Sequence, residues 1–141
     1  MVRVLITEAH EGLGLALVKE YLADAENQVV AFCGDATNCD DLNTLKTSVN
    51  DKQLLVVDVN LADEESIKAS VKPIEGFVDA LDLLIFNPGF VPDEFGDHSG
   101  NVPTEIFRSY MFKLRSPRWL AEFVRPLLEN GTNSICIGMS L

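Results

Sequence analysis

After Met1, the chain continues with Val2-Arg3-Val4-Leu5-Ile6-Thr7-Glu8-Ala9-His10-Glu11-Gly12-Leu13-Gly14, and this segment is the strongest indication of the fold class. Its first six residues are mostly apolar or β-branched, which predicts a short buried strand. Apolar side chains then recur at helical spacing, so residues 12–25 are expected to form a helix. Glycines at such a strand-to-helix turn either let a phosphate reach the helix N-terminus or simply allow tight packing. Both interpretations stay open.

The same alternation continues along the chain. Short apolar runs predict further strands at 28–33, 54–58, 81–86 and 134–139, each separated from the next by helix-period segments. The last of these segments, 104–129, follows a loop rich in Gly and Pro, and Pro117 is expected to kink it. Strands alternating with helices favour parallel strands joined by right-handed crossovers. Residues 1–141 are therefore expected to form a single α/β domain with helices on both faces of the sheet.

Charge and composition exclude several classes of partner. The chain has 141 residues with 22 Asp and Glu against 11 Lys and Arg, a formal net charge of -11. Such an acidic chain repels nucleic acids and anionic membranes. No segment approaches the roughly 20 apolar residues that span a bilayer. Because the first strand is predicted to begin at Val2, no signal peptide is expected.

The cysteines and histidines predict neither a redox motif nor a metal site. No C-x-x-C pair occurs among Cys33, Cys39 and Cys136, and the two histidines, His10 and His98, are far apart in the sequence. Reduced structural thiols and a cytoplasmic location are the expectation.

Four motifs in order carry a family resemblance. Thr7, Gly12 and Gly14 match a T-G-x-x-x-G-x-G fingerprint, with Glu8 in place of its first glycine. Asp58 corresponds to an acidic residue after the third strand. Phe86-Asn87-Pro88-Gly89 corresponds to an N-N-A-G element, and Ser140 falls at a catalytic serine. Through these motifs the chain resembles the N-terminal part of the short-chain dehydrogenase/reductases (SDRs), especially the branch typified by the C-factor (C-signal) protein.

The resemblance implies a fold, a cofactor and a set of site residues. The fold would be a three-layer, Rossmann-type doubly wound parallel sheet with strand order 3-2-1-4-5, truncated before the family's last helix and strands. The cofactor would be NAD or NADP. The implied cofactor residues are Thr7, Gly12, Leu13 and Gly14 at the pyrophosphate, Asp58 and Val59 at the adenine, and Asn87 and Gly89 at the adenosine ribose. Ser140 would be the one member of the family's catalytic set that this chain retains.

Two acidic residues of the first loop depart from the family pattern. Glu8 replaces a glycine that borders the cofactor, and its carboxylate would repel a pyrophosphate unless it turned into water. For unit charges ~5 Å apart at an effective dielectric of about 20, that repulsion is about 3 kcal/mol. Glu8 would also be strained if the turn requires a positive φ. Glu11 adds a second carboxylate or is simply a solvated loop residue.

Other departures lie on the adenosine side and on the central helix. Gly34 stands where the branch carries an arginine for the 2′-phosphate of NADP, and Asp35 either reaches a ribose hydroxyl, favouring NAD, or belongs to a surface turn. Phe86 either loses the polar contacts of an asparagine or simply ends a buried strand, and Pro88 removes an N–H. Lys113 either replaces the family's active-site asparagine or is a solvated helix residue.

The family's Tyr-x-x-x-Lys pair has no counterpart in this sequence, whose tyrosines are Tyr21 and Tyr110. A chain without this general acid/base is expected to be catalytically inactive. Three possibilities stay open: an inactive relative, by truncation or as a natural short product; an oxidoreductase active when full-length or completed by a partner; and a non-catalytic signalling module. The last strand would form an exposed edge, so a homo-oligomer is expected through 104–129, through 134–139, or through both.

Overall fold

The computed structural model describes residues 1–34, 39–87 and 104–139, and the side chains of the last range from Leu114 onward. Its strands form one parallel sheet in the order β3-β2-β1-β4-β5, which confirms the predicted fold class. The elements are β1 (Arg3–Ile6), α1 (Gly12–Leu22), β2 (Gln28–Cys33), α2 (Asp40–Ser48), β3 (Leu54–Asp58), α3 (Glu64–Phe77), β4 (Leu83–Phe86), α4 (Thr104–Phe123), α5 (Arg125–Asn130) and β5 (Ile135–Gly138).

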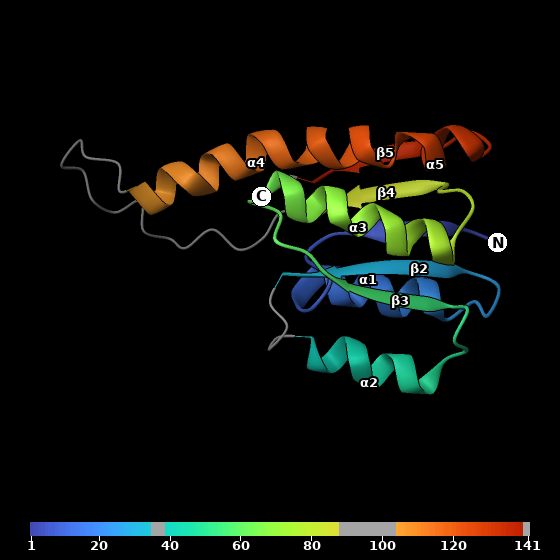
Figure 1. Cartoon of the computed structure of the whole chain (residues 1–141). Coiled ribbons are helices and arrows are strands. Elements are labelled where there is room, and N and C mark those ends of the chain that lie inside the picture. The colour runs from blue at the N-terminus through green and yellow to red at the C-terminus, as the bar shows by residue number, and fades with distance from the viewer. Residues whose placement is uncertain (35–38, 88–103, 140–141) are drawn as a thin grey trace.

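The sheet lies between two layers of helices, as Figure 1 shows, with α1 and α2 on one face and α3, α4 and α5 on the other. Successive strand residues point to opposite faces and therefore feed two separate cores. Leu5, Phe32 and Leu84 pack in the cluster shared with α3 and α4, whereas Val4 and Ala31 pack in the cluster shared with α1 and α2. This double burial explains why the strands are apolar without a polar face.

The end of the central helix differs from the expectation. Pro117 lies inside α4 without interrupting it, and the break comes later, at Val124, between α4 and α5. Pro126 near the start of α5 has no N–H to continue the helical hydrogen bonds, which accounts for a break at this point. The single helix predicted over 104–129 is therefore two helices.

The cysteine prediction was wrong, because Cys33 and Cys39 form a disulfide with their Cα atoms 5.9 Å apart. Cys33 ends β2, and Cys39 directly precedes α2, which returns along the same face of the sheet. Both side chains therefore enter the same apolar cluster. This proximity is a tertiary consequence that the absence of a C-x-x-C spacing does not reveal. Cys136 is free and exposed.

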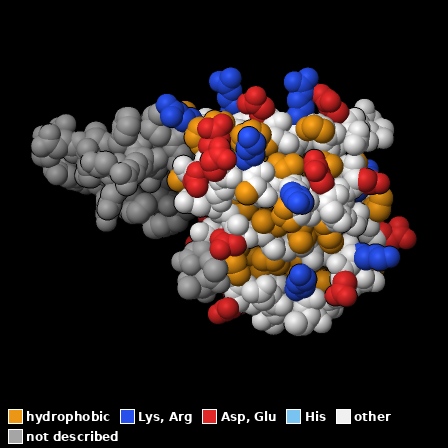
Figure 2. All heavy atoms as spheres, in the orientation of Figure 1, with side chains coloured by type: hydrophobic (Ala, Val, Ile, Leu, Met, Phe, Trp, Pro, Cys, Tyr) orange, Lys and Arg blue, Asp and Glu red, His pale blue; other side chains and the backbone are white. Residues whose placement is uncertain are grey.

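The two sheet edges carry apolar surface. All four residues of β5 are exposed, with Ile135 58% and Ile137 42% accessible. At the other edge Leu55, Val56 and Val57 of β3 are half-buried. Figure 2 shows hydrophobic side chains gathered in the middle of the face on which β3 lies, surrounded by charged ones. Within the described part of the chain, no helix is long and apolar enough to cross a membrane.

Candidate functional site

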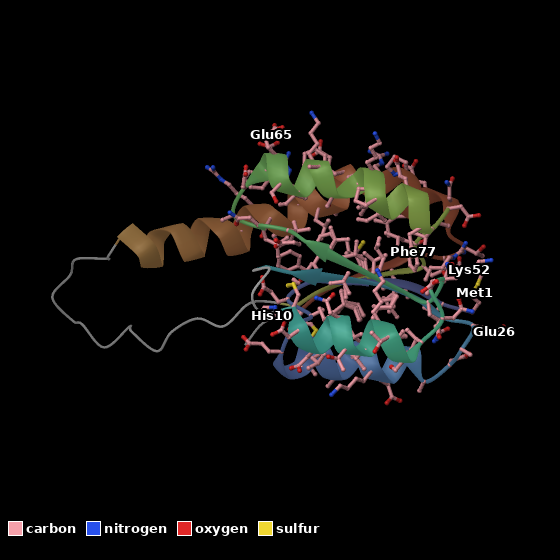
Figure 3. All side chains as sticks on the ribbon, turned by 60° about the horizontal axis from the view of Figure 1, so that its bottom comes forward. Met1, His10, Glu26, Lys52, Glu65 and Phe77 are labelled. Atoms are coloured by element: carbon pink, nitrogen blue, oxygen red, sulfur yellow. A yellow bond between two sulfur atoms is a disulfide. The ribbon has the colours of Figure 1, made fainter. Side chains whose placement is uncertain are left out.

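The candidate site lies at the carboxyl edge of the sheet, where the loop between β1 and α1 begins. The chain runs from β1 outward to β2 and β3 on one side, then returns to β4 and β5 on the other. Ligands of such doubly wound sheets bind at this switch point, between β1 and β4. Figure 3 places His10 of the loop at the same end of the molecule as Glu65, near the start of α3, and away from Met1 and Lys52.

Thr7 and Asn87 join the ends of β1 and β4 across the switch point. The Thr7 hydroxyl donates to the Asn87 carbonyl at 3.0 Å and accepts from the Asn87 N–H at 2.9 Å. The Asn87 side-chain amide donates to the Glu8 carbonyl at 3.2 Å. Both residues are buried. These two predicted cofactor residues therefore hold the loop in place, and their side chains are already engaged with the protein.

The two loop glycines have different roles. A Cβ on Gly14 would collide with the Glu8 carbonyl oxygen and would lie 2.9 Å from the Ala9 Cα, so Gly14 is needed for close packing. Gly12 instead has a φ of 55°, a conformation that favours glycine, and nothing lies within 4 Å of its Cβ position. The packing interpretation therefore holds at Gly14, whereas phosphate binding at Gly12 stays a prediction.

Helix α1 begins at Gly12 with its first N–H groups uncapped by a side chain. Glu11 occupies the N-cap in an extended conformation, but its carboxylate makes no capping hydrogen bond. Leu13 in the first turn is 53% exposed although it is apolar. Free N–H groups and the positive end of the helix dipole attract anions, and a phosphate is the usual one.

The Glu8 carboxylate lies near the residue that follows β2. Its oxygens lie 3.6 and 3.9 Å from the Cβ position of Gly34, which directly follows β2. The same position is 3.9 Å from the Val59 carbonyl oxygen. The Glu8 side chain is only 20% exposed. The carboxylate therefore lies beside the end of β2 and is not turned fully into water.

The Glu8 backbone is strained, and its carboxyl is perturbed. Its φ of 47° falls in the left-handed region, which costs a non-glycine residue about 1–2 kcal/mol. Burial raises the pKa of the Glu8 carboxyl, while His10 lowers this pKa and Glu11 raises it. Strained, partly buried acidic residues concentrate at binding sites.

His10 lies between the two loop carboxylates, an arrangement that sequence reasoning missed. Its Nδ1 is 3.9 Å from Glu8 Oε2, and its Nε2 is 3.5 Å from Glu11 Oε1. Its Nδ1 is buried and has no hydrogen-bond partner within the described ranges. The acidic residues at i−2 and i+1 were the only sequence signal for this contact.

The adenosine-side residues fall at the ends of β2, β3 and β4. Asp58 ends β3 with an exposed side chain. Val59 is buried in the core, and its N–H donates a hydrogen bond to the Cys33 carbonyl oxygen at 2.8 Å. Gly34 is exposed. Phe86 is 7% exposed and packs in the α3–α4 core, which supports its interpretation as the end of a buried strand.

The remaining predicted positions lie outside the described residues or side chains. These are Asp35, Pro88, Gly89, Tyr110, Lys113 and Ser140. No group of three or more metal-ligating side chains occurs within the portion that the structure describes.

Known proteins resemble this chain in both sequence and structure. Short-chain dehydrogenase RED3 of Pyricularia oryzae is 30% identical over 127 residues, which cover 89% of this chain and 51% of that protein. An NADPH-bound carbonyl reductase from chicken fatty liver superposes with a TM-score of 0.77 at 25% identity, over 89% of this chain and 47% of the reductase. The carbonyl reductase Sniffer of Caenorhabditis elegans, at 23% identity, superposes with a TM-score of 0.83 over 98% of this chain and 63% of its own.

The chain thus spans about half the length of the curated relative it matches. Residues 2–138 match the family described as short chain dehydrogenase. The match runs through the glycine loop, the Thr7–Asn87 pair and all five strands, so the chain belongs to the short-chain dehydrogenase family.

Proposed function

We propose that the chain binds a nicotinamide dinucleotide at the carboxyl edge of its sheet and, as these 141 residues stand, does not transfer hydride. The observation that carries the binding proposal is the open, positive-φ turn at Gly12 in front of an uncapped helix. Backbone N–H groups of Gly12, Leu13 and Gly14 would hold the pyrophosphate there.

The neighbouring strand ends fit the adenosine part of the dinucleotide. Asp58 would line the adenine. Val59 would only support this position from the core, because its side chain is buried and its N–H donates to the Cys33 carbonyl. Asn87 and Gly89 would border the adenosine ribose. Thr7 and Asn87 would act chiefly by fixing the loop, since their polar groups already bond each other and Glu8. The bound dinucleotide would supply hydride-transfer chemistry, whereas these residues would bind and orient it.

The proposal that the chain does not transfer hydride rests on the missing Tyr-x-x-x-Lys pair. Of its two tyrosines, Tyr21 and Tyr110, neither has a lysine four residues further on. Tyr21 lies on α1 and packs against the core on that side. Without a positioned proton donor, a factor of about 10²–10⁴ in rate is lost. An activity completed by further residues or by a partner is the alternative, because RED3 is nearly twice as long as the aligned region.

Calorimetric titration with NAD and with NADP, at low and moderate salt, tests the binding proposal. Affinity tighter than about 1 mM for either dinucleotide is the expected result. Absorbance of the reduced nicotinamide, followed with carbonyl substrates present, should then show no turnover. Absence of binding would contradict the first half of the proposal, and measurable turnover would contradict the second.

We further propose that copies of this chain associate through β5, through α4, or through both. Ile135 and Ile137 on the edge strand and Leu114 on α4 present exposed apolar side chains, and exposed edges recruit other strands. Light scattering should report a dimer or larger species. A Leu114→Ser, Ile137→Thr double variant should shift the protein toward monomer, and a monodisperse monomeric parent chain would contradict the proposal.

The C-factor-like branch, the cytoplasmic location and a signalling role stay predictions.

A further inference from the structure

We propose that Glu8 selects the coenzyme: its carboxylate accepts hydrogen bonds from the adenosine ribose hydroxyls and excludes a 2′-phosphate, so the site takes NAD and rejects NADP. This inference rests on the proposed dinucleotide binding. It further specifies that the site accepts NAD in preference to NADP and that Glu8 determines this preference.

The geometry places the carboxylate where the ribose is recognised in doubly wound sheets. There, an acidic residue near the end of β2 accepts from the ribose 2′-hydroxyl in NAD sites, whereas an arginine nearby holds the 2′-phosphate in NADP sites. Here the first residue after β2 is Gly34, which offers no side chain. The Glu8 carboxylate fills that space from the neighbouring loop, 3.6 Å from the Gly34 Cβ position.

The base of the Glu8 side chain is fixed. The Asn87 amide donates to the Glu8 carbonyl at 3.2 Å, and the Ala9 N–H donates to the Phe32 carbonyl at 2.8 Å. These bonds tie the loop to the ends of β4 and β2. They hold a glutamate at a φ of 47°, where a glycine would fit without strain. These bonds fix the backbone position from which the Glu8 side chain extends toward the end of β2.

The surrounding charge disfavours a phosphate at the same place. Asp58 is exposed at the end of β3 and pairs there with Cys33, the last residue of β2. In the described residues, the ion pairs formed by lysine or arginine are those of Arg3 and Arg125, and none involves Glu8 or Glu11. A 2′-phosphate would therefore meet carboxylates, whereas a ribose diol offers two donors to an acceptor-only group.

The test compares dissociation constants for NAD and NADP, by calorimetry at fixed salt, in the parent chain and in Glu8→Gln, Glu8→Gly and Glu11→Gln. The last variant is the matched control, because it removes an equal charge from the same loop. Circular dichroism verifies that each variant folds. The parent chain should bind NAD roughly tenfold or more tightly than NADP. Both Glu8 variants should narrow this ratio roughly tenfold, mainly through tighter NADP binding, whereas Glu11→Gln should move both affinities together.

Two results would overturn the inference while leaving dinucleotide binding intact: a Glu8→Gln variant that keeps the parent ratio, or a Glu11→Gln variant that narrows it equally. If neither dinucleotide binds to the parent chain or to Glu8→Gly, the proposed function itself fails, and the selection by Glu8 fails with it.

Discussion

At position 8 a glutamate adopts a backbone conformation that favours glycine, and its carboxyl lies in a partly buried place. The sequence predicted strain at Glu8 only if the turn required a positive φ, and the observed φ of 47° meets that condition. The direction of the side chain was not predictable, because it depends on the end of β2 lying beside the loop. The contacts of His10 with the Glu8 and Glu11 carboxylates likewise depend on the conformation of the loop.

Replacing Glu8 by Gln should alter the pH dependence of stability. Burial raises the pKa of the Glu8 carboxyl, so the folded chain binds this proton more tightly than the unfolded chain does. The free energy of unfolding should therefore fall as pH rises from the ordinary carboxyl range through the raised pKa, and then level off. Glu8→Gln should lack this decline. Urea denaturation across a pH series measures it, with Glu11→Gln as control. Parallel pH profiles for Glu8→Gln and the parent chain would show the prediction to be wrong.

Gly14 should tolerate no larger side chain. In Gly14→Ala the added methyl group meets the Glu8 carbonyl and the Ala9 Cα, and overpacking of this kind costs about 1–3 kcal/mol. Gly76→Ala is a suitable control, because nothing lies within 4 Å of its Cβ position in α3 and alanine favours a helix by up to about 1 kcal/mol. Urea denaturation of both variants should give changes of opposite sign. An equally stable Gly14→Ala variant would contradict the packing role.

Among the elements, local pattern predicted most positions. Helix α3 has a local start signal, because Asp63 caps it by accepting from the Glu65 N–H at 3.1 Å and the acidic residues Glu64 and Glu65 lie in its first turn. The observed strands lie at the predicted positions, because strands of a parallel sheet covered on both faces have continuous apolar sequences. The break at Val124 was missed although Pro126 marks it locally, because the bend was expected at Pro117 instead. The Cys33–Cys39 disulfide was missed because no C-x-x-C spacing announces it.

The disulfide should contribute measurably to stability. Closing the short loop between the end of β2 and the start of α2 restricts the unfolded chain by about 2 kcal/mol. Dithiothreitol should therefore lower the free energy of unfolding by about that amount. In denaturant, thiol titration should count Cys136 alone before reduction and all three cysteines afterwards. A count of three in the unreduced chain would contradict the pairing.

At the scale of the whole molecule, the alternation of strands and helices was sufficient to predict a parallel sheet covered on both faces. The resemblance to one family supplied the strand order β3-β2-β1-β4-β5, which the structure confirms. The order matters for function, because it brings the ends of β1 and β4 together at the switch point. The hydrogen-bonded Thr7–Asn87 pair connects the two strand ends at this point, and the Gly12 turn follows in the loop after β1, with free space at its Cβ position.

The central claim is that this open turn accepts a dinucleotide. The most direct measurement is calorimetric titration of NAD into the parent chain, Gly12→Ala and Gly76→Ala. The parent chain and Gly76→Ala should bind NAD equally, with a dissociation constant below about 1 mM. Gly12→Ala should bind NAD at least roughly tenfold more weakly, because alanine resists a φ of 55°. Equal affinity in all three proteins, or no binding to the parent chain, would contradict the account.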